Sequence, residues 1–144
     1  MARINTMQRR PLNEHLSHLL AQANRHISRQ FSAEGVSFDQ WRLMMALSEE
    51  GGSTMGKLAD ELAINHPTLT KLVDRMVEEA LVYRVPDPED RRKVRMFLSD
   101  KGAALLEIQN SRVQLHEARV EGSFGNEDLQ KLRRMLETFI KQIS

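Results

Sequence analysis

Residues 55–102 of the chain read MGKLADELAINHPTLTKLVDRMVEEALVYRVPDPEDRRKVRMFLSDKG. Apolar residues recur at helical spacing through the first half of this stretch. The second half holds two runs with strand character, separated by a charged segment. We therefore expect two short helices joined by a tight turn and followed by a β-hairpin with a basic tip.

The two helices differ in what they leave exposed. The first covers residues 55–62, and Pro67 fits the opening turn of the second, where its missing N–H would have no helical partner anyway. Asn65 or His66 caps this second helix. Its buried face follows the spacing i, i+3, i+4, i+7, i+8 and i+11 in Leu69, Leu72, Val73, Met76, Val77 and Ala80. The remaining face is polar and partly cationic, with Thr68, Thr70, Lys71, Asp74 and Arg75.

The hairpin is predicted from two β-prone runs, residues 81–85 and 93–98. Two prolines in residues 86–92 are expected to keep that segment out of the hydrogen-bonded ladder. The tip concentrates positive charge, with four cations in five residues: Arg91, Arg92, Lys93 and Arg95. Asp90 is placed to pair with Arg92 and to aim its guanidinium.

Helices are also expected before this stretch. Apolar residues at helical spacing predict one long amphipathic helix over residues 11–34, which ends at Gly35. Ser37 and Gln40 form a capping box that starts a second, mostly apolar helix, predicted to be the buried centre of the domain. Part of the apolar stripe on the first helix is predicted to contact a partner subunit.

Two more helices follow the hairpin. Ser99 is predicted to cap a helix over residues 100–123, and Asn126 to cap a last one over residues 126–143. The last helix carries another apolar stripe. The fold class expected from the whole pattern is mainly α with a small β-hairpin (α+β).

Composition limits the class of protein. A chain of 144 residues with 40% hydrophobic residues fits a single globular domain. No apolar run is long enough to span a membrane or to form a signal peptide, so we expect a cytoplasmic protein that does not contact membranes. The chain has no cysteine, which excludes disulfides, thiolate zinc sites and cysteine-based redox switching.

A helix pair that exposes small polar and basic residues fits the major groove of B-DNA. Taken alone, such a face is more often merely solvated. The basic hairpin beside it favours DNA binding, because a narrow tip can enter the adjacent minor groove, where arginine responds to groove width.

The stretch LADELAINHPTLTKLVDRMVEEALV and the following DPEDRRKVRMFLSDKG closely resemble the MarR family of bacterial winged helix-turn-helix regulators. The resemblance extends over nearly the whole chain. It implies a winged helix-turn-helix over residues 37–99, and dimerisation helices at 11–34 and 126–143 that are linked by 100–123. It further implies a homodimer on a palindromic double-stranded DNA operator.

The resemblance also implies which residues contact DNA. On the second helix of the pair these are Thr68, Thr70, Lys71 and Arg75. On the wing they are Arg91 and Arg92, with Asp90 as the orienting partner. The sequence departs from the family at Ala80, where glycine is common, at Ser99, where threonine is commoner, and at His66-Pro67, where arginine or serine is frequent.

Family members commonly respond to small molecules, often aromatic carboxylates. We therefore hypothesise a repressor released by an aromatic acid, which binds in a cleft lined by His15, His18 and Trp41. The alternative for each of these residues is a purely structural role, and for Trp41 in particular a place in the core.

The sequence also bears on three other functions. An enzyme is not expected, because the sequence has no glycine-rich phosphate loop, no HExxH motif and no cysteine nucleophile. A metal-responsive regulator is an alternative, since His15, His18 and His26 share one side of the first helix, but only Glu14 supplies a nearby carboxylate; no metal or cofactor is predicted. A dimeric interaction module that does not bind DNA is the remaining alternative.

Overall fold

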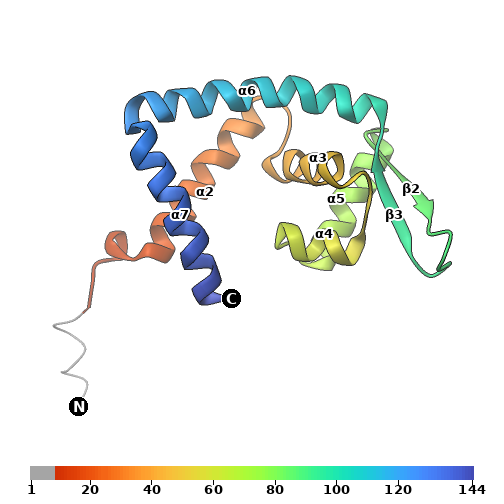
Figure 1. Cartoon of the computed structure of the whole chain (residues 1–144), viewed down its shortest axis with the longest axis horizontal. Coiled ribbons are helices and arrows are strands. Elements are labelled where there is room, and N and C mark those ends of the chain that lie inside the picture. Colours follow the sequence, from red (N-terminus) through yellow and green to blue (C-terminus); the bar gives the residue numbers. More distant parts are fainter. Residues whose placement is uncertain (1–8) are drawn as a thin grey trace, which may run out of the picture.

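The computed structural model describes residues 9–144. The elements in chain order are η1 (Leu12–Glu14), α2 (Leu16–Ala33), α3 (Phe38–Glu50), β1 (Ser53–Thr54), α4 (Met55–Leu62), α5 (His66–Glu78), β2 (Val82–Pro86), β3 (Val94–Leu98), α6 (Asp100–Phe124) and α7 (Asn126–Ile143). The fold is mainly helical with a small antiparallel sheet, which confirms the predicted fold class. In Figure 1, α6 spans the molecule, with α3, α4, α5 and the sheet near its start and α2 and α7 near its end.

The first of these two groups, which we call the winged half, has its own hydrophobic core. Helix α3 lies at the centre, and its Leu43, Met44 and Leu47 are almost completely buried. Facing residues close the core from α4, α5 and β3; they are Leu58, Leu69, Val73, Met76 and Met96. The prediction that α3 is the buried centre of the domain is therefore confirmed.

Polar side chains fix the helix starts at the predicted places. The Ser37 hydroxyl accepts from the N–H of Gln40 at 3.0 Å, and the Gln40 side chain accepts from the N–H of Ser37 at 2.9 Å, which completes the capping box. Asn65 caps α5 by accepting from the N–H of Thr68 at 2.9 Å. These bonds satisfy N–H groups that a helix leaves unpaired at its start.

The sheet has three strands where the sequence predicted a two-stranded hairpin. The strand order is β1-β3-β2, and Ser53 of β1 pairs with Met96 of β3. A strand of two residues is too short to produce an alternating pattern, so hydrophobic periodicity does not reveal β1. Pro86 also pairs with Val94 rather than lying outside the ladder, and β2 tolerates it because β2 is an edge strand.

The predicted continuous helix over residues 11–34 is interrupted. His15 has an extended backbone (φ −78°, ψ 127°) and separates the 3₁₀ turn η1 from α2. The side-chain spacing of a 3₁₀ turn is close to that of an α-helix, so the apolar periodicity runs across the break without revealing it. At the other end α2 stops at Ala33, and Gly35 has the positive φ (+83°) expected of a helix end.

The last two helices meet at a sharp corner. Asn126 was predicted to cap the last helix, but this was wrong: Gly125 is the N-cap residue, and no side-chain capping bond is made there. Gly125 has φ +91°, a conformation that glycine adopts readily, and it turns the chain from α6 directly into α7. Within residues 9–144, no helix is long and apolar enough to cross a membrane.

Candidate nucleic-acid interface

Helix α5 is amphipathic, and the packing of one face determines what the other presents. Leu69, Val73 and Met76 are buried against the winged half. The residues predicted to contact DNA lie outside this buried face and are all exposed: Thr68, Thr70, Lys71 and Arg75. The fold therefore brings the four predicted side chains of α5 to one solvent-facing surface.

Two of these side chains already have partners within the helix. The Thr70 hydroxyl donates to the carbonyl oxygen of His66 at 2.9 Å, and the Arg75 guanidinium lies 3.1 Å from the Glu79 carboxylate. Such exposed pairs are worth little, so neither prevents the side chain from turning to another acceptor. Both groups remain available at the surface.

The wing tip, residues 87–93, is built from two aspartate-centred turns. The Asp87 carboxylate accepts from the N–H of Glu89 at 2.8 Å, and the Asp90 carboxylate accepts from the N–H of Arg92 at 3.0 Å. Each bond folds the backbone locally, as aspartate commonly does in turns. Lys93 closes the tip, since its carbonyl accepts from Asp87 N–H at 2.9 Å and its N–H donates to the Asp90 carbonyl at 3.0 Å.

Arg92 projects from this framed tip. Its Nε lies 3.5 Å from the Asp90 carboxylate, which agrees with the pair expected from the sequence, and its side chain is 93% exposed. Arg91 and Lys93 are exposed beside it. Asp90 therefore fixes the backbone at Arg92 and attracts its guanidinium, which can still turn toward another acceptor.

Sequence reasoning missed the role of Asp87. Its second carboxylate oxygen lies 3.4 Å from Nε of Arg95 on β3. The N–H of Glu89, and then the Arg95 guanidinium, hold the pKa of Asp87 below its ordinary 3.8, although partial burial acts in the opposite direction. The spacing of Asp87 and Asp90 before a basic run is the signal that could have indicated two such turns.

The junction between α5 and the wing is also fixed by contacts that the sequence did not indicate. Arg84 of β2 pairs with Asp74 of α5. Lys101 of α6 donates from Nζ to the carbonyl oxygen of Glu79 at 2.7 Å. The Ser99 hydroxyl donates to the carbonyl of Ala80 at 2.6 Å, and the backbone of Ala80 has φ +60°. These contacts join α5 to strand β2 and to the start of α6.

A cleft of about 440 Å³ lies between α2, α3, α6 and α7. Trp41 lines it together with the rings of Phe31 and Phe38, and its indole N–H donates to Asn110 Oδ1 at 2.8 Å. His15 and His18 are not among the lining residues. His15 lies within hydrogen-bond distance of the Arg10 carbonyl at 3.1 Å, and His18 is half-buried on α2.

The predicted effector residues are therefore divided: the structure places Trp41 in the cleft and the two histidines outside it. In the part of the chain that the structure describes, no three histidine or carboxylate side chains are close enough to hold a metal ion together.

A helix pair with an exposed cationic face beside a basic wing defines the winged helix-turn-helix class of DNA-binding proteins. The family model described as "MarR family" matches residues 34–93. The homoprotocatechuate degradative operon repressor of Escherichia coli is 32% identical over 101 residues, which cover 70% of this chain and 68% of that protein. The chain belongs to the MarR family of transcriptional regulators, and this confirms the expectation that it is not an enzyme.

Solved structures show the same fold at lower identity. The PcaV transcriptional regulator of Streptomyces coelicolor, in complex with its natural ligand, superposes with a TM-score of 0.85 at 16% identity, over 94% of this chain and 99% of PcaV. A mutant of MarR from Escherichia coli, complexed with operator DNA, gives a TM-score of 0.78 at 23% identity, over 86% of this chain and 92% of that one.

Proposed function

We propose that this regulator is a homodimeric repressor that binds a palindromic operator and releases it when a small ligand, an aromatic acid, is bound. The observation that carries the DNA-binding part is the pairing of the exposed α5 face with the basic wing tip, from which Arg92 projects with 93% of its side chain exposed. In this proposal α5 contacts bases and phosphates in the major groove, and Arg92 enters the flanking minor groove.

Several side chains share the contacts to DNA. Thr68 and Thr70 can donate to or accept from base edges or phosphates, and Lys71 and Arg75 reach guanine edges or phosphates. Arg91 adds a phosphate contact beside Arg92, while Asp90 orients Arg92. In this arrangement α5 distinguishes the DNA bases, and the wing responds to the shape of the minor groove.

Exposed apolar surface supports a homodimer. Large apolar side chains of η1, α2, α6 and α7 are exposed in the single chain; among them are Leu12, Leu16, Leu115, Phe124, Met135, Ile140 and Ile143. A second copy that covers these faces would make residues 11–34 and 126–143 the dimerisation helices, linked by 100–123 to the winged half at 37–99.

An aromatic acid is favoured by the relatives and by the cleft. The Escherichia coli relative represses a homoprotocatechuate degradative operon, according to its name. The cleft is of a size that suits a small ligand, and its walls combine aromatic rings with the cationic side chain of Arg133 and the imidazole of His116. Trp41 is the effector contact that the cleft supports, and contacts from His15 and His18 remain predictions.

Release would follow from a shift in population between two arrangements of the dimer. Two α5 helices can occupy successive major grooves only when they are about 34 Å apart. A ligand that binds better to another spacing lowers DNA affinity, and a ligand that binds both spacings equally changes nothing.

The DNA-binding proposal is tested by selecting duplexes from a random pool with the purified protein at physiological salt. We expect a palindromic sequence to be enriched, and its affinity to fall steeply as salt rises, because phosphate contacts release counterions. A protein that dimerises but enriches no duplex would instead be an interaction module.

A thermal-shift panel of aromatic acids tests the effector. A ligand that raises the melting temperature should also release the selected duplex. An acid that stabilises the protein without weakening DNA binding would contradict the mechanism of release.

A further inference from the structure

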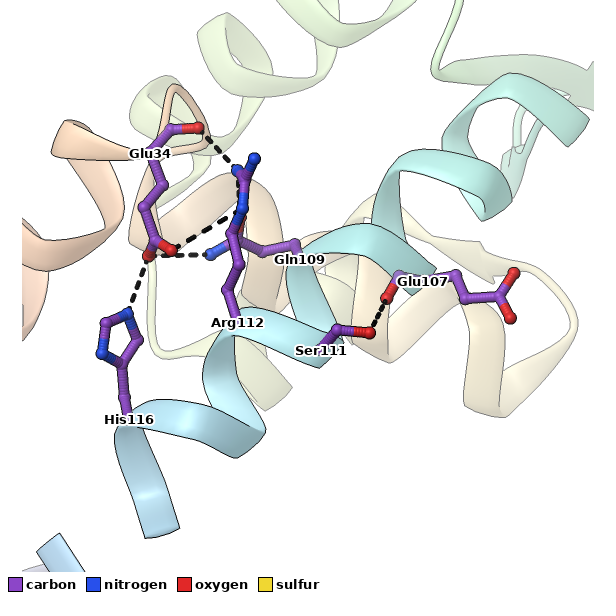
Figure 2. Close-up of polar contacts among 6 residues, drawn as sticks. All are labelled: Glu34, Glu107, Gln109, Ser111, Arg112 and His116. Atoms are coloured by element: carbon purple, nitrogen blue, oxygen red, sulfur yellow. Dashed lines mark hydrogen bonds and ion pairs between the residues drawn. The ribbon is translucent and has the colours of Figure 1, made fainter. Parts of the chain in front are cut away.

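The chain passes between the dimerisation helices and the winged half at two places. One is the turn between α2 and α3, residues 34–37, and the other is helix α6, which is continuous across both parts (Figure 1). These two passages meet at Glu34. Figure 2 shows its carboxylate and its backbone carbonyl both directed toward side chains of α6.

Four residues form what we call the Glu34 cluster: Glu34, Gln109, Arg112 and His116. His116 donates from Nε2 to the Glu34 carboxylate at 3.0 Å, and Gln109 donates to the same oxygen at 3.5 Å. Arg112 donates from Nη1 to the backbone carbonyl of Glu34 at 2.9 Å, while its Nε lies 3.7 Å from the other carboxylate oxygen. One glutamate thus joins three side chains that lie 75 to 82 residues further along the chain.

The cluster is more protected than an ordinary surface ion pair. Gln109 is fully buried, the side chains of Glu34 and His116 are 19% and 25% exposed, and Arg112, at the edge of the cluster, is 41% exposed. Charge-assisted hydrogen bonds in such surroundings are screened less by solvent, and a network of them restricts geometry more than isolated pairs do. The three α6 residues follow the spacing i, i+3, i+7, so they lie along one face of the helix.

A second bond lies next to the cluster. The Trp41 indole of α3 donates to Asn110 of α6 at 2.8 Å. His116 and Trp41 also share the lining of the cleft. The start of α6 packs into the core of the winged half through Leu105 and Leu106, and the Trp41–Asn110 bond adds a polar contact from α3. The Glu34 cluster fastens the 34–37 turn, which leads into the winged half, to the same helix.

We propose that the Glu34 cluster is a positioning joint: it fastens the turn between α2 and α3 to α6, holds the winged half at a fixed angle to the dimerisation helices, and through this angle sets the half-site spacing that the dimer accepts. The inference rests on the proposed function, because spacing matters only when two winged halves bind one duplex. The residues of the cluster do not touch DNA and act through the orientation of α5 and the wing.

The first test measures orientation without DNA. The native chain has no cysteine, so Glu61→Cys on α4 and Gln22→Cys on α2 introduce two spin labels at exposed positions. The labelled protein is diluted with unlabelled protein, so that pulsed electron paramagnetic resonance measures the distance between the two labels of one chain. We expect Glu34→Gln to broaden this distance distribution about twofold or more, since the joint then permits several angles. An unchanged distribution would overturn the proposal whether or not the protein binds DNA.

The second test uses the duplex that the wild-type protein selects. Inserting or deleting one base pair between the half-sites moves them by about 3.4 Å and rotates one relative to the other. We expect the wild-type protein to prefer the selected spacing by about tenfold or more, and Glu34→Gln to reduce this preference to within about threefold. Equal loss of affinity for every spacing would indicate a merely structural role and contradict the joint.

Two further substitutions, and one double variant, make the result specific. Glu107→Gln is the matched control, because Glu107 is exposed on the same helix and its carboxylate points away from the cluster in Figure 2. It should leave both measurements unchanged. His116→Gln should reproduce the effect of Glu34→Gln, and the double variant should add little to either, since both substitutions remove the same interaction. If the effects of the two substitutions on spacing preference are fully additive, the proposed joint is wrong. If Glu34→Gln does not fold, both measurements are made with His116→Gln instead.

Discussion

Arg92 is the residue on which the proposed wing contact depends most. Its guanidinium lies at the tip of the hairpin, beside the Asp90 carboxylate and exposed to solvent. We predict that Arg92→Ala weakens binding to the selected duplex by about 1–3 kcal/mol, as the loss of a groove contact typically does, and leaves the dimer intact. Fluorescence anisotropy with the labelled duplex measures this difference.

The matched control is Arg134→Ala on α7. This arginine is also exposed, but α7 and the wing lie at opposite ends of the molecule (Figure 1). The control should bind the duplex as the wild-type protein does. If the two variants bind equally well, Arg92 does not contact the groove.

Ala80 offers a residue-scale prediction about stability. Its φ of +60° is unfavourable for an L-amino acid with a side chain and is readily adopted by glycine. We predict that Ala80→Gly raises the free energy of unfolding by up to about 1 kcal/mol, because relief of strain exceeds the added freedom of the unfolded chain. Urea denaturation followed by circular dichroism measures the change.

The same substitution elsewhere should have the opposite sign. Ala103 is exposed inside α6, where glycine is unfavourable, so Ala103→Gly should destabilise the protein by about 1 kcal/mol. If both variants lose stability equally, the positive φ at Ala80 imposes no strain.

At the scale of elements, the start of α6 depends on a close approach. A Cβ at Gly102 would overlap the carbonyl oxygen of Leu81, and that carbonyl already accepts from the N–H of Ser99 at 2.9 Å. We predict that Gly102→Ala destabilises the protein by about 1–3 kcal/mol, because backbone must move to admit the methyl group. Thermal and urea unfolding both report it.

Gly122 in the same helix gives the control. A Cβ there meets nothing within 4 Å. Gly122→Ala should therefore stabilise the protein by about 1 kcal/mol through helix propensity alone. A Gly102→Ala variant as stable as this control would exclude the close approach.

The wing tip should respond to acid. The folded pKa of Asp87 lies below its ordinary value of 3.8, so its contribution to the tip is present above that value and is lost as pH falls through the folded pKa. Carbon-detected NMR titration should place the Asp87 carboxyl midpoint below 3.8, and Arg95→Ala should move the midpoint upward. Arg91→Ala, which removes an exposed charge of the same tip, should move it less. A midpoint at or above 3.8 would contradict the two-turn geometry.

Local signals were sufficient to predict most elements from the sequence. The Ser37 capping box and the Asn65 cap depend on residues three apart, which a sequence displays directly. The errors arose where backbone geometry decided the outcome. The break at His15 keeps the apolar spacing, β1 is too short for a pattern, and Gly125 replaces Asn126 as the cap because of its positive φ.

The candidate site likewise has features that were predictable from the sequence and features that were not. The exposed face of α5 and the pairing of Asp90 with Arg92 follow from periodicity and short spacing, so they were predictable. The Glu34 cluster joins residues at least 75 positions apart, and no local pattern indicates that α6 returns past the end of α2. Contacts of this kind are set by how elements pack and require the structure.

At the scale of the whole molecule, the exposed apolar face of α7 is the surface that the proposed homodimer would cover. Ile140 and Ile143 are 57% and 66% exposed near the end of the chain. We predict that Ile140→Glu weakens the dimer by about 30-fold or more, because it forces a charge into a face that a second copy would bury. Sedimentation velocity across a range of protein concentrations measures the dissociation constant.

Gln142→Glu is the matched control for this test, since it adds the same charge at an exposed polar position of the same helix. It should leave the dimer unchanged. The Ile140→Glu variant should lose affinity for the palindromic duplex in proportion to dimer dissociation and keep its weak affinity for a single half-site, because the winged half has its own core. A variant that stays dimeric, or one that loses half-site binding as well, would show that α7 does not hold the two winged halves together.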